Sequence, residues 1–534
     1  MLAALSSRIP KRSRLPSILS GVGVIAALYA AFFAGLGRNP LLDPDEPIYG
    51  QFIKEMVRGG DWLTPHYNGA LWFDKPPLFY WLSCACVKLV GFGEYAIRMP
   101  SAIFAALTVV MVYLLAVRDF GKRAGLIASA VVGTTLLQII MSHAAATDSV
   151  MVFFMVASLY AYRRWVEIDG RGRLGWMAVC GVAAGFGMLT KGPVVPLLLS
   201  MTFLIHLIWT KQPRRLISFD LPVWLVTMLA IGLPWYVAMY VMHREPFMEQ
   251  WVMANNITRF VKPLHESHTG QWYSYFRNIP MVVLFFFPWT VFLPQAIARH
   301  GRSNAGAKLA FCWAAVVFVF FSISKTQNFT YMLPAFPALA VLVGALFGER
   351  EKLDRPIRTG LWVGVVFSLV MAAGVLVMAR KQTIPGVIPI AIVLALVFAI
   401  PAVWALTRRS RLAPVPWMIA AGMLAFNLMA VNVVLPGYAV NKSSKDVARY
   451  IRRSPEVTVA AFGLWRPGLF FYLDRKPIDI RLPEDLARLA AASKPALVVC
   501  KQKQRAQVGP YCADEVYASG DLVVYANKAY LARR

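Results

Sequence analysis

Apolar runs of roughly 20 residues dominate the chain and alternate with short polar segments. A helix that crosses the hydrocarbon core of a bilayer needs about 20 predominantly apolar residues. By this measure the sequence predicts a polytopic α-helical membrane protein with about 13 transmembrane helices. These helices are centred near residues 27, 108, 133, 155, 182, 200, 231, 290, 315, 338, 368, 396 and 425.

The basic residues of the loops indicate an orientation, because lysine and arginine gather in the cytoplasmic loops of membrane proteins. Clusters follow every second predicted helix. They place the N-terminus in the cytoplasm and residues 38–98, residues 243–280 and the C-terminal tail outside. The clusters are Lys11, Arg12 and Arg14; Lys122 and Arg123; Arg163, Arg164, Arg171 and Arg173; Lys211, Arg214 and Arg215; Arg299, Arg302 and Lys308; Arg350, Lys352, Arg355 and Arg358; and Arg408, Arg409 and Arg411.

The first apolar run could be a signal peptide or an anchor, and its length favours an anchor, since a signal core has about 7–15 residues. In the first outer loop, QFIKEMVRGG is amphipathic, with Phe52, Ile53, Met56 and Val57 at helical spacing. Such a pattern predicts a juxtamembrane helix that lies along the membrane interface.

The pattern changes near residue 440, where short runs typical of strands replace the long apolar segments. VTVAAFG, PALVVC and DLVVYANK are rich in β-branched residues and are separated by helical stretches. This alternation predicts a small α/β domain of roughly 90 residues. We therefore expect a transmembrane domain over residues 1–437 and an α/β domain on the outer side over residues 438–534.

Composition supports the membrane assignment and excludes nucleic acid as a partner. The 534 residues are 58% hydrophobic and 15% charged, with a mean hydropathy of +0.55. Soluble domains contain about 25% charged residues. The net charge of +28 comes from short clusters between apolar runs, and no soluble nucleic-acid-binding module accompanies them. The expected partners are membrane lipids instead.

The six cysteines have no metal-binding spacing. Cys84, Cys86, Cys180 and Cys312 lie in apolar runs, where a small buried thiol is common. The last two, Cys500 and Cys512, both fall in the outer C-terminal stretch, and whether they form a disulfide stays open.

Charged groups close to a bilayer are expensive, so those predicted on the outer side mark candidate function. The stretch LLDPDEPIYG contributes Asp43, Asp45 and Glu46, and DKPP contributes Asp74 and Lys75. A structural alternative for Asp45 is a helix cap, since acids are favoured in the first turn.

Further candidates follow along the chain. Asp148 begins a predicted helix, where it could equally be a cap. Lys191 ends another, where it could be a lysine that snorkels to the interface. The surrounding GFGMLTKGP is not a phosphate loop, because Thr190 precedes the lysine. Lys325 lies in a later outer loop, where a solvated lysine is the simpler interpretation.

The outer loop NNITRFVKPLHESHTGQWYSYF is rich in polar and aromatic residues. It carries Arg259, Lys262, His265, Glu266, His268, Trp272 and Tyr273. Two histidines and an acid offer metal-ligating atoms, but no fixed ligand set emerges, and we expect no metal site there.

These groups suit a reaction on an anionic lipid. Lysine and arginine can hold a phosphate leaving group and stabilise its developing charge. A carboxylate can accept a proton from an attacking group or stabilise positive charge at a sugar carbon. The sequence contains no nucleotide-binding fingerprint, which a donor held in the membrane would not require.

Several motifs resemble one family. DPDEPIY, GDW-x-x-P-x-x-NG, DKPPL-x-YWL and G-x-x-E-x-x-x-R-x-PSA are similar to the first outer loop of bacterial GT-C glycosyltransferases of the protein mannosyltransferase superfamily. The aminoarabinose (lipid A) transferase branch looks nearest. The resemblance continues through TDSVMVFF, LTKGP, PWY, NNITRF and FSISKTQNFTYMLP, and so covers roughly residues 40–345.

The resemblance implies a GT-C fold in the bacterial inner membrane and inverting transfer of a sugar, without nucleotide, from polyprenyl (undecaprenyl) phosphate to lipid A or another envelope glycolipid. It implies no firm cofactor, and a divalent metal stays open. It makes Asp45 the catalytic acid, Glu46 its motif partner and Asp148 a second acid. Lys75, Lys191 and Arg259 would bind the donor phosphate. Further candidates for substrate binding are Tyr49, Tyr80, His268, Trp272 and Lys325.

Two departures leave the sugar and the acceptor open. The branch commonly has FEKP where this chain has FDKP, and DPDEGRY-like acids where this chain has DPDEPIY. One alternative is a protein O-glycosyltransferase that uses the same kind of donor. Another is a transporter of lipid-linked sugars without catalysis, but the sequence shows no clear internal repeat, which many transporters have.

Overall fold

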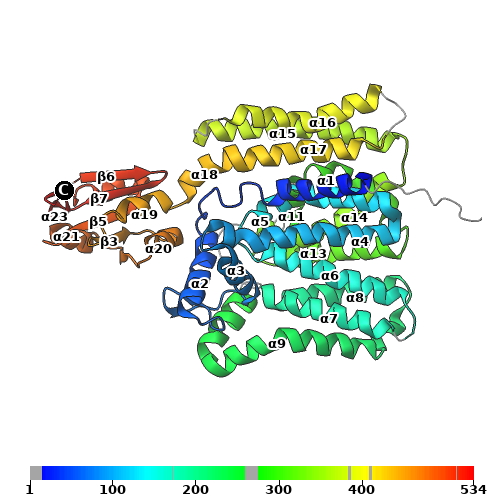
Figure 1. Cartoon of the computed structure of the whole chain (residues 1–534), viewed down its shortest axis with the longest axis horizontal. Helices are drawn as coiled ribbons and strands as arrows, with labels where there is room; N and C mark the ends of the chain where they lie inside the picture. Colours follow the sequence, from blue (N-terminus) through cyan, green and yellow to red (C-terminus); the bar gives the residue numbers. More distant parts are fainter. Residues whose placement is uncertain are drawn as a thin grey trace, which may run out of the picture.

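The computed structural model describes residues 15–170, 172–258, 275–382, 386–407, 412–512 and 514–533, and the long helices of its first part lie side by side in a bundle (Figure 1). A smaller unit of short strands and helices stands beyond one end of this bundle, and α18 leads to it. Among the basic residues that indicated an orientation, Lys11, Arg12, Arg14, Arg171, Arg408, Arg409 and Arg411 lie outside the described residues.

Every predicted helix centre lies within a helix, or, for residue 290, within the 3₁₀ turn Trp289–Phe292 (η4). The helices of the bundle are α1 (Leu15–Phe32), α4 (Glu94–Thr134), α5 (Leu136–Ser142), α6 (Asp148–Glu167), α7 (Gly172–Lys191), α8 (Val194–Trp209), α9 (Asp220–Phe247), α11 (Asn278–Phe285), α12 (Leu293–His300), α13 (Ala305–Ile323), α14 (Phe336–Gly348), α15 (Arg355–Gln382), α16 (Val387–Thr407), α17 (Val415–Met429) and α18 (Leu435–Lys442).

Among the described residues, eight helices are long and apolar enough to cross a membrane, or nine if the pair Asn278–Phe285 and Trp289–His300, bent by 108°, is one span. This number is lower than the predicted number of about 13, and three helices account for part of the difference. The helix α6 carries Arg163 and Arg164, α8 has 16 residues, and α4 counts once. The number of spans therefore stays a prediction.

The 41 residues of α4 form two helices rather than one. Gly121 has φ 82° and ψ 171°, which breaks the helix. The hydroxyl of Ser129 donates a hydrogen bond of 3.3 Å to the carbonyl of Val109, and a Cβ atom on Gly125 would lie 2.3 Å from Val117. Residues so far apart in one straight helix would lie roughly 12–30 Å apart, because the rise is 1.5 Å per residue. The chain therefore folds back at Gly121, between the centres predicted at residues 108 and 133.

The unit beyond the bundle is built around a five-stranded sheet in the order β4-β3-β5-β7-β6. Strand β3 runs parallel to β4 and to the central strand β5, whereas β7 runs antiparallel to β5 and β6. The strands are β3 (Thr458–Phe462), β4 (Ile478–Ile480), β5 (Ala496–Lys501), β6 (Asp514–Ser519) and β7 (Leu522–Ala526); the helices are α19 (Lys445–Ile451), α20 (Pro467–Leu473), α21 (Pro483–Ala491), α22 (Arg505–Val508) and α23 (Lys528–Leu531).

The runs VTVAAFG, PALVVC and DLVVYANK coincide with β3, β5 and β7, whose side chains are mostly buried. The sequence did not indicate β6, because its side chains are largely exposed and it lacks an apolar run. Cys500 and Cys512 are buried free thiols, and burial raises the pKa of Cys500 to about 12. The division of the chain into two domains stays a prediction.

The segment predicted to be the first outer loop contains α2 (Asp45–Gly59), the hairpin of β1 (His66–Tyr67) and β2 (Ala70–Leu71), and α3 (Leu78–Val90). The predicted helix over QFIKEMVRGG is present as part of α2. Its apolar side chains Phe52, Ile53 and Met56 are fully buried against protein, in a cluster that includes Phe471 of α20. Because protein covers this face, it is not available to lipid.

We expect Gly121→Ala to lower the thermal stability of the protein in detergent. No atom blocks a Cβ at Gly121, but its backbone conformation is one that only glycine adopts readily, and the strain is of order 1–3 kcal/mol. The control is Gly374→Ala in α15, which also has room for a Cβ and has an ordinary helical backbone. An unchanged melting temperature for Gly121→Ala would contradict the turn assigned to this residue.

Candidate active site

The three acids of LLDPDEPIYG have three different surroundings. Asp45 is the first residue of α2, but the N-cap position is Pro44, and no side chain caps this helix. The residue Asp45 is exposed, in contrast to its buried neighbour Glu46. The cap interpretation is thus not supported, although an acid in the first turn still interacts favourably with the helix dipole.

Glu46 is held by protein donors on both carboxylate oxygens. Arg98 of α4 forms a two-pronged ion pair with it, at 2.8 Å from Nε and 2.7 Å from the terminal nitrogen. The backbone N–H groups of Leu42 and Ala145 donate to the same carboxylate at 2.8 and 2.7 Å. Arg98 also donates to the carbonyls of Leu36, Asn39 and Pro40. This arrangement favours a positioning role for Glu46 over direct chemistry.

Asp43 faces the C-terminal unit. Its carboxylate accepts hydrogen bonds from the backbone N–H of Gly468 at 2.5 Å and from the hydroxyl of Ser444 at 3.0 Å, and it lies 3.6 Å from the guanidinium of Arg466. Burial raises the pKa of Asp43, and the Gly468 N–H and Arg466 oppose that rise. Asp43 therefore acts as a contact between the two parts of the chain.

Asp148 and Lys191 form an ion pair of 2.6 Å between the first residue of α6 and the last residue of α7. Both side chains are largely buried, and the ammonium of Lys191 also lies 5.6 Å from the ring centre of Tyr331. The lysine thus points to an acid inside the protein, which does not fit the snorkelling interpretation. Tyr331 was missed as a site residue, although it lies in the motif FSISKTQNFTYMLP.

Lys75 lies just before α3 and is largely buried, with its ammonium 2.9 Å from the carboxylate of Asp74. Hydrogen bonds of 3.0 Å join both backbone groups of Phe73 to Gln250 and Asn255 of the π-helical segment η2 (Met248–Thr258). This segment leads directly to residue 259. The candidates Arg259, His265, Glu266, His268 and Trp272, with Lys262 and Tyr273, lie outside the described residues.

The remaining candidates are two tyrosines and a lysine. Tyr80 is fully buried, 5.0 Å from the ring of Phe52 and 5.8 Å from that of Tyr49. This position favours packing over substrate contact for Tyr80, whereas Tyr49 is partly exposed. Lys325 is exposed in the loop between α13 and the 3₁₀ segment that contains Tyr331.

Local contacts bring the described candidates to the same end of the bundle. Glu46, next to Asp45, bonds the N–H of Ala145, three residues before Asp148. Tyr49 of α2 packs at 5.9 Å from Phe79, four residues after Lys75. The helices α2 and α3 accordingly lie together at the end of the bundle that faces the C-terminal unit (Figure 1).

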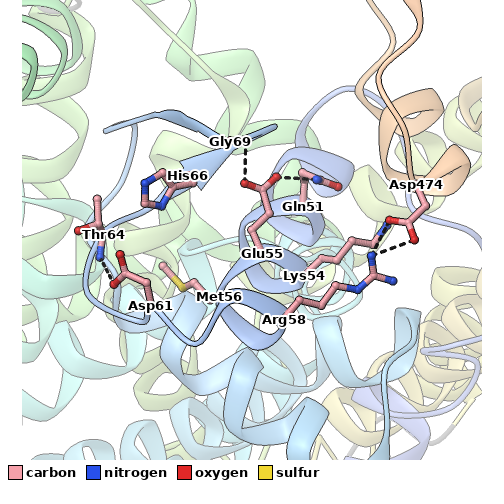
Figure 2. A pocket seen from close by; sticks show the side chains of 11 residues that line it. Gln51, Lys54, Glu55, Met56, Arg58, Asp61, Thr64, His66, Gly69 and Asp474 are labelled. Carbon is pink, nitrogen blue, oxygen red and sulfur yellow. Dashed lines mark hydrogen bonds and ion pairs between the residues drawn. The ribbon is translucent and has the colours of Figure 1, made fainter.

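The structure also shows a cavity of about 370 Å³ beside the second half of α2, between the β1–β2 hairpin and Asp474. Figure 2 shows Lys54 and Arg58 reaching the same carboxylate of Asp474, at 3.1 and 2.7 Å. The opposite wall holds Glu55, which accepts hydrogen bonds from Gln51 and from the N–H groups of Asn68 and Gly69. Lys54 and Arg58 are thus paired with Asp474, whereas neutral donors hold Glu55.

Part of the chain matches a known family, and part of it matches curated relatives. Residues 74–238 match the family model described as dolichyl-phosphate-mannose-protein mannosyltransferase. An undecaprenyl phosphate-α-4-amino-4-deoxy-L-arabinose arabinosyl transferase of Erwinia tasmaniensis is 28% identical over 369 residues, and one of Pseudomonas fluorescens is 30% identical over 361 residues. These matches cover 66% of this chain and 64% and 62% of the relatives, so they span just under two thirds of the relatives' length.

A longer match and two solved structures extend the similarity over nearly the whole chain. An uncharacterized protein of Aquifex aeolicus is 26% identical over 492 residues, 90% of each chain. The structure of ArnT from Cupriavidus metallidurans bound to undecaprenyl phosphate has a TM-score of 0.81 and 23% identity, with 96% of this chain and 99% of that chain covered. Its apo state has a TM-score of 0.79. This chain and ArnT from Cupriavidus metallidurans therefore share one fold.

In the described part of the chain, no group of three or more histidine, cysteine or acidic residues is placed to hold a metal ion. The only residues that the sequence singled out for such a site are His265, Glu266 and His268, outside the described range.

Substitutions at the buried Glu46 and the exposed Asp45 should have different effects on stability. We expect Glu46→Gln to lower the free energy of unfolding by about 3–5 kcal/mol, because it leaves the buried Arg98 without its carboxylate. Asp45→Asn, at an exposed position, should change it by about 0.5 kcal/mol or less. Thermal unfolding of both purified variants checks this, and equal melting temperatures would contradict the role assigned to Glu46.

Proposed function

We propose that this chain belongs to the GT-C glycosyltransferases of the protein mannosyltransferase superfamily, nearest to the aminoarabinose transferase branch. The protein transfers a sugar, aminoarabinose or a related one, from polyprenyl phosphate to lipid A or another envelope glycolipid. The observation that carries this proposal is the contact between Glu46 and the segment before Asp148, because it brings the exposed Asp45 to the end of the bundle that holds the paired lysines.

The cations bind the phosphate of the donor. Lys75 and Lys191 are each paired with one carboxylate, Asp74 and Asp148. An ammonium group has three donors, so Lys191 can keep its carboxylate and still donate to a phosphate oxygen. The carboxylates hold the lysines in place before the donor arrives, and Arg259 would add a further cation. Together they stabilise the charge that develops on the leaving polyprenyl phosphate.

Asp45 acts on the acceptor or on the sugar carbon. If the acceptor is a hydroxyl, Asp45 takes its proton as the oxygen attacks the anomeric carbon from the face opposite the phosphate, which inverts the configuration. If the acceptor is a lipid phosphate, its oxygen is already anionic, and Asp45 orients the reacting groups instead. In both cases the sugar–oxygen bond to the polyprenyl phosphate breaks, and that phosphate leaves with the electron pair.

The protein is a multi-pass protein of the bacterial inner membrane, with its N-terminus in the cytoplasm. Residues 1–437 form the transmembrane catalytic domain and residues 438–534 a periplasmic α/β domain. The alternation of basic loops supports this orientation, because it places the acids of the first outer loop on the side where a lipid-linked sugar would be presented.

A second candidate function is transfer of the sugar to serine or threonine of secreted proteins. The match of residues 74–238 to a protein mannosyltransferase model favours it. The donor chemistry is the same in both cases, so the two proposals differ only in the acceptor.

Two substitutions test the assigned roles. We expect Asp45→Asn and Lys75→Ala each to lower transfer by about 10²-fold or more, since one removes the acid that acts on the acceptor or sugar and the other a phosphate donor. Transfer from a polyprenyl-phosphate sugar by purified enzyme measures this. The control is Lys88→Ala, at an exposed lysine of α3 that packs on Trp62. Full activity of Asp45→Asn would remove Asp45 from the mechanism.

Mass spectrometry of cells with and without the protein tests the acceptor. Because transfer adds one sugar, we expect lipid A from expressing cells to gain the mass of one sugar residue. Unchanged lipid A together with altered secreted glycoproteins would favour the second candidate. No change in either fraction would count against both acceptors.

A further inference from the structure

The segment just before the candidate catalytic acid is attached to the C-terminal unit. The backbone N–H of Asp43 donates to the carbonyl of Lys442 at 2.8 Å, and its carboxylate bonds Gly468 and Ser444 and faces Arg466. The side chain of Asp43 is only 4% exposed and that of Arg466 only 9% exposed. A buried carboxylate of this kind depends on its donors and its cation, because water cannot replace them.

The residues around the contact of Asp43 with Gly468 and Arg466 are closely packed. A Cβ atom on Gly468 would lie 2.6 Å from an oxygen of Asp43, and one on Gly50 would lie 2.9 Å from the ring of Phe471. The N–H of Leu41 donates to the hydroxyl of Tyr472 at 2.7 Å. The helix α20 therefore rests directly on the residues that precede α2 and on the first turns of α2.

Two further contacts hold the same helix at its other end. Lys54 donates to the carbonyl of Phe471 at 2.5 Å, and Lys54 and Arg58 both bind Asp474 (Figure 2). Burial lowers the pKa of Lys54, and its bond to Asp474 opposes that change. The unit is thus attached along the length of α2 rather than at one point.

The backbone at Asp45 is consequently held from two sides. On one side, two residues earlier, Asp43 is bound to the C-terminal unit; on the other, the next residue, Glu46, is bound to Arg98 of α4. Arg466 is itself oriented by an ion pair with Asp521. Asp45 itself is exposed, and its backbone lies between these two anchored neighbours.

We propose that the C-terminal α/β unit is a part of the active-site framework, and that Arg466 and Asp43 are positioning residues for Asp45. This inference rests on the proposed function, and it assigns the unit a role in the chemical step rather than in holding the acceptor. Without Arg466, the buried Asp43 carboxylate lacks a cation, and the segment that carries Asp45 shifts from its place. A displacement of about 1 Å in a reacting group can cost about 10²-fold in rate.

The first test is Arg466→Gln in the full-length protein. We expect kcat to fall by about 10- to 100-fold, because the variant displaces Asp45, whose interaction with the reacting groups is made in the transition state. KM for the donor and for the acceptor should stay close to wild type. The control is Arg505→Gln, which removes an exposed ion pair with Glu515 inside the same unit and should leave both constants unchanged. An unchanged kcat, or a raised KM for the acceptor with normal kcat, would overturn the proposal.

Rescue and pH dependence add readouts that a loss of folding would not produce. The double variant Asp43→Asn with Arg466→Gln should recover most of kcat, because no unpaired charge is left. The charged or titratable groups that act on Asp43 are Arg466, Asp521 and Tyr67. Since burial raises the pKa of Asp43 and Arg466 opposes this, the single variant should regain activity relative to wild type as the pH falls and Asp43 takes up a proton. The double variant should lack this dependence, and equal pH profiles for the two would count against the proposal.

Hydrogen exchange separates this proposal from the proposed function. In Arg466→Gln, the amides of residues 41–46 should exchange faster than in wild type, whereas those of β5 should not change. If the wild-type protein transfers no sugar at all, the proposed function fails, and this measurement alone decides whether Arg466 holds the segment around Asp45. Unchanged exchange at residues 41–46 would overturn the positioning role even if the enzyme is an active transferase.

Discussion

A carboxylate that leaves water must find a cation or several hydrogen-bond donors, and this constraint organises the end of the bundle that faces the C-terminal unit. Glu46 meets it with Arg98, Asp43 with Arg466, and Asp148 with Lys191. Each pair joins segments that are far apart in the sequence. The same pairs that satisfy buried charge therefore also fix the relative positions of α2, α4, α6, α7 and the C-terminal unit.

The three acids of the short stretch DPDE have three different surroundings. Its first acid attaches to the C-terminal unit, its last acid attaches to the bundle, and only Asp45 between them is exposed. In the proposed function, the exposed Asp45 is the one acid that acts on the acceptor, and cations receive the leaving phosphate. In the proposed framework, the two flanking acids, Asp43 and Glu46, hold the backbone at Asp45 in place, as preorganised catalysis requires.

Much of the fold was predictable, because apolar runs report directly on helices that need a nonpolar environment. All the predicted centres fall in helices, including the two that Gly121 separates within α4. The ion pair of Asp148 with Lys191 was not predicted, because the sequence placed both residues on one side without a partner for either. The buried partners Arg98 and Arg466 did not emerge, because an arginine in a motif or a polar stretch has no sequence signal for the partner it binds 52 or 423 residues away.

The sequence by itself determined the class of protein, the helices of the bundle, most of the strands of the C-terminal unit and the candidate acids and cations. These depend on local composition and periodicity, which a chain carries in its order of residues. Only the tertiary structure decided which acid is exposed and which are buried, and that protein rather than lipid covers the apolar face of α2. Burial and ion pairing are properties of what surrounds a side chain, and those surroundings come from segments hundreds of residues apart.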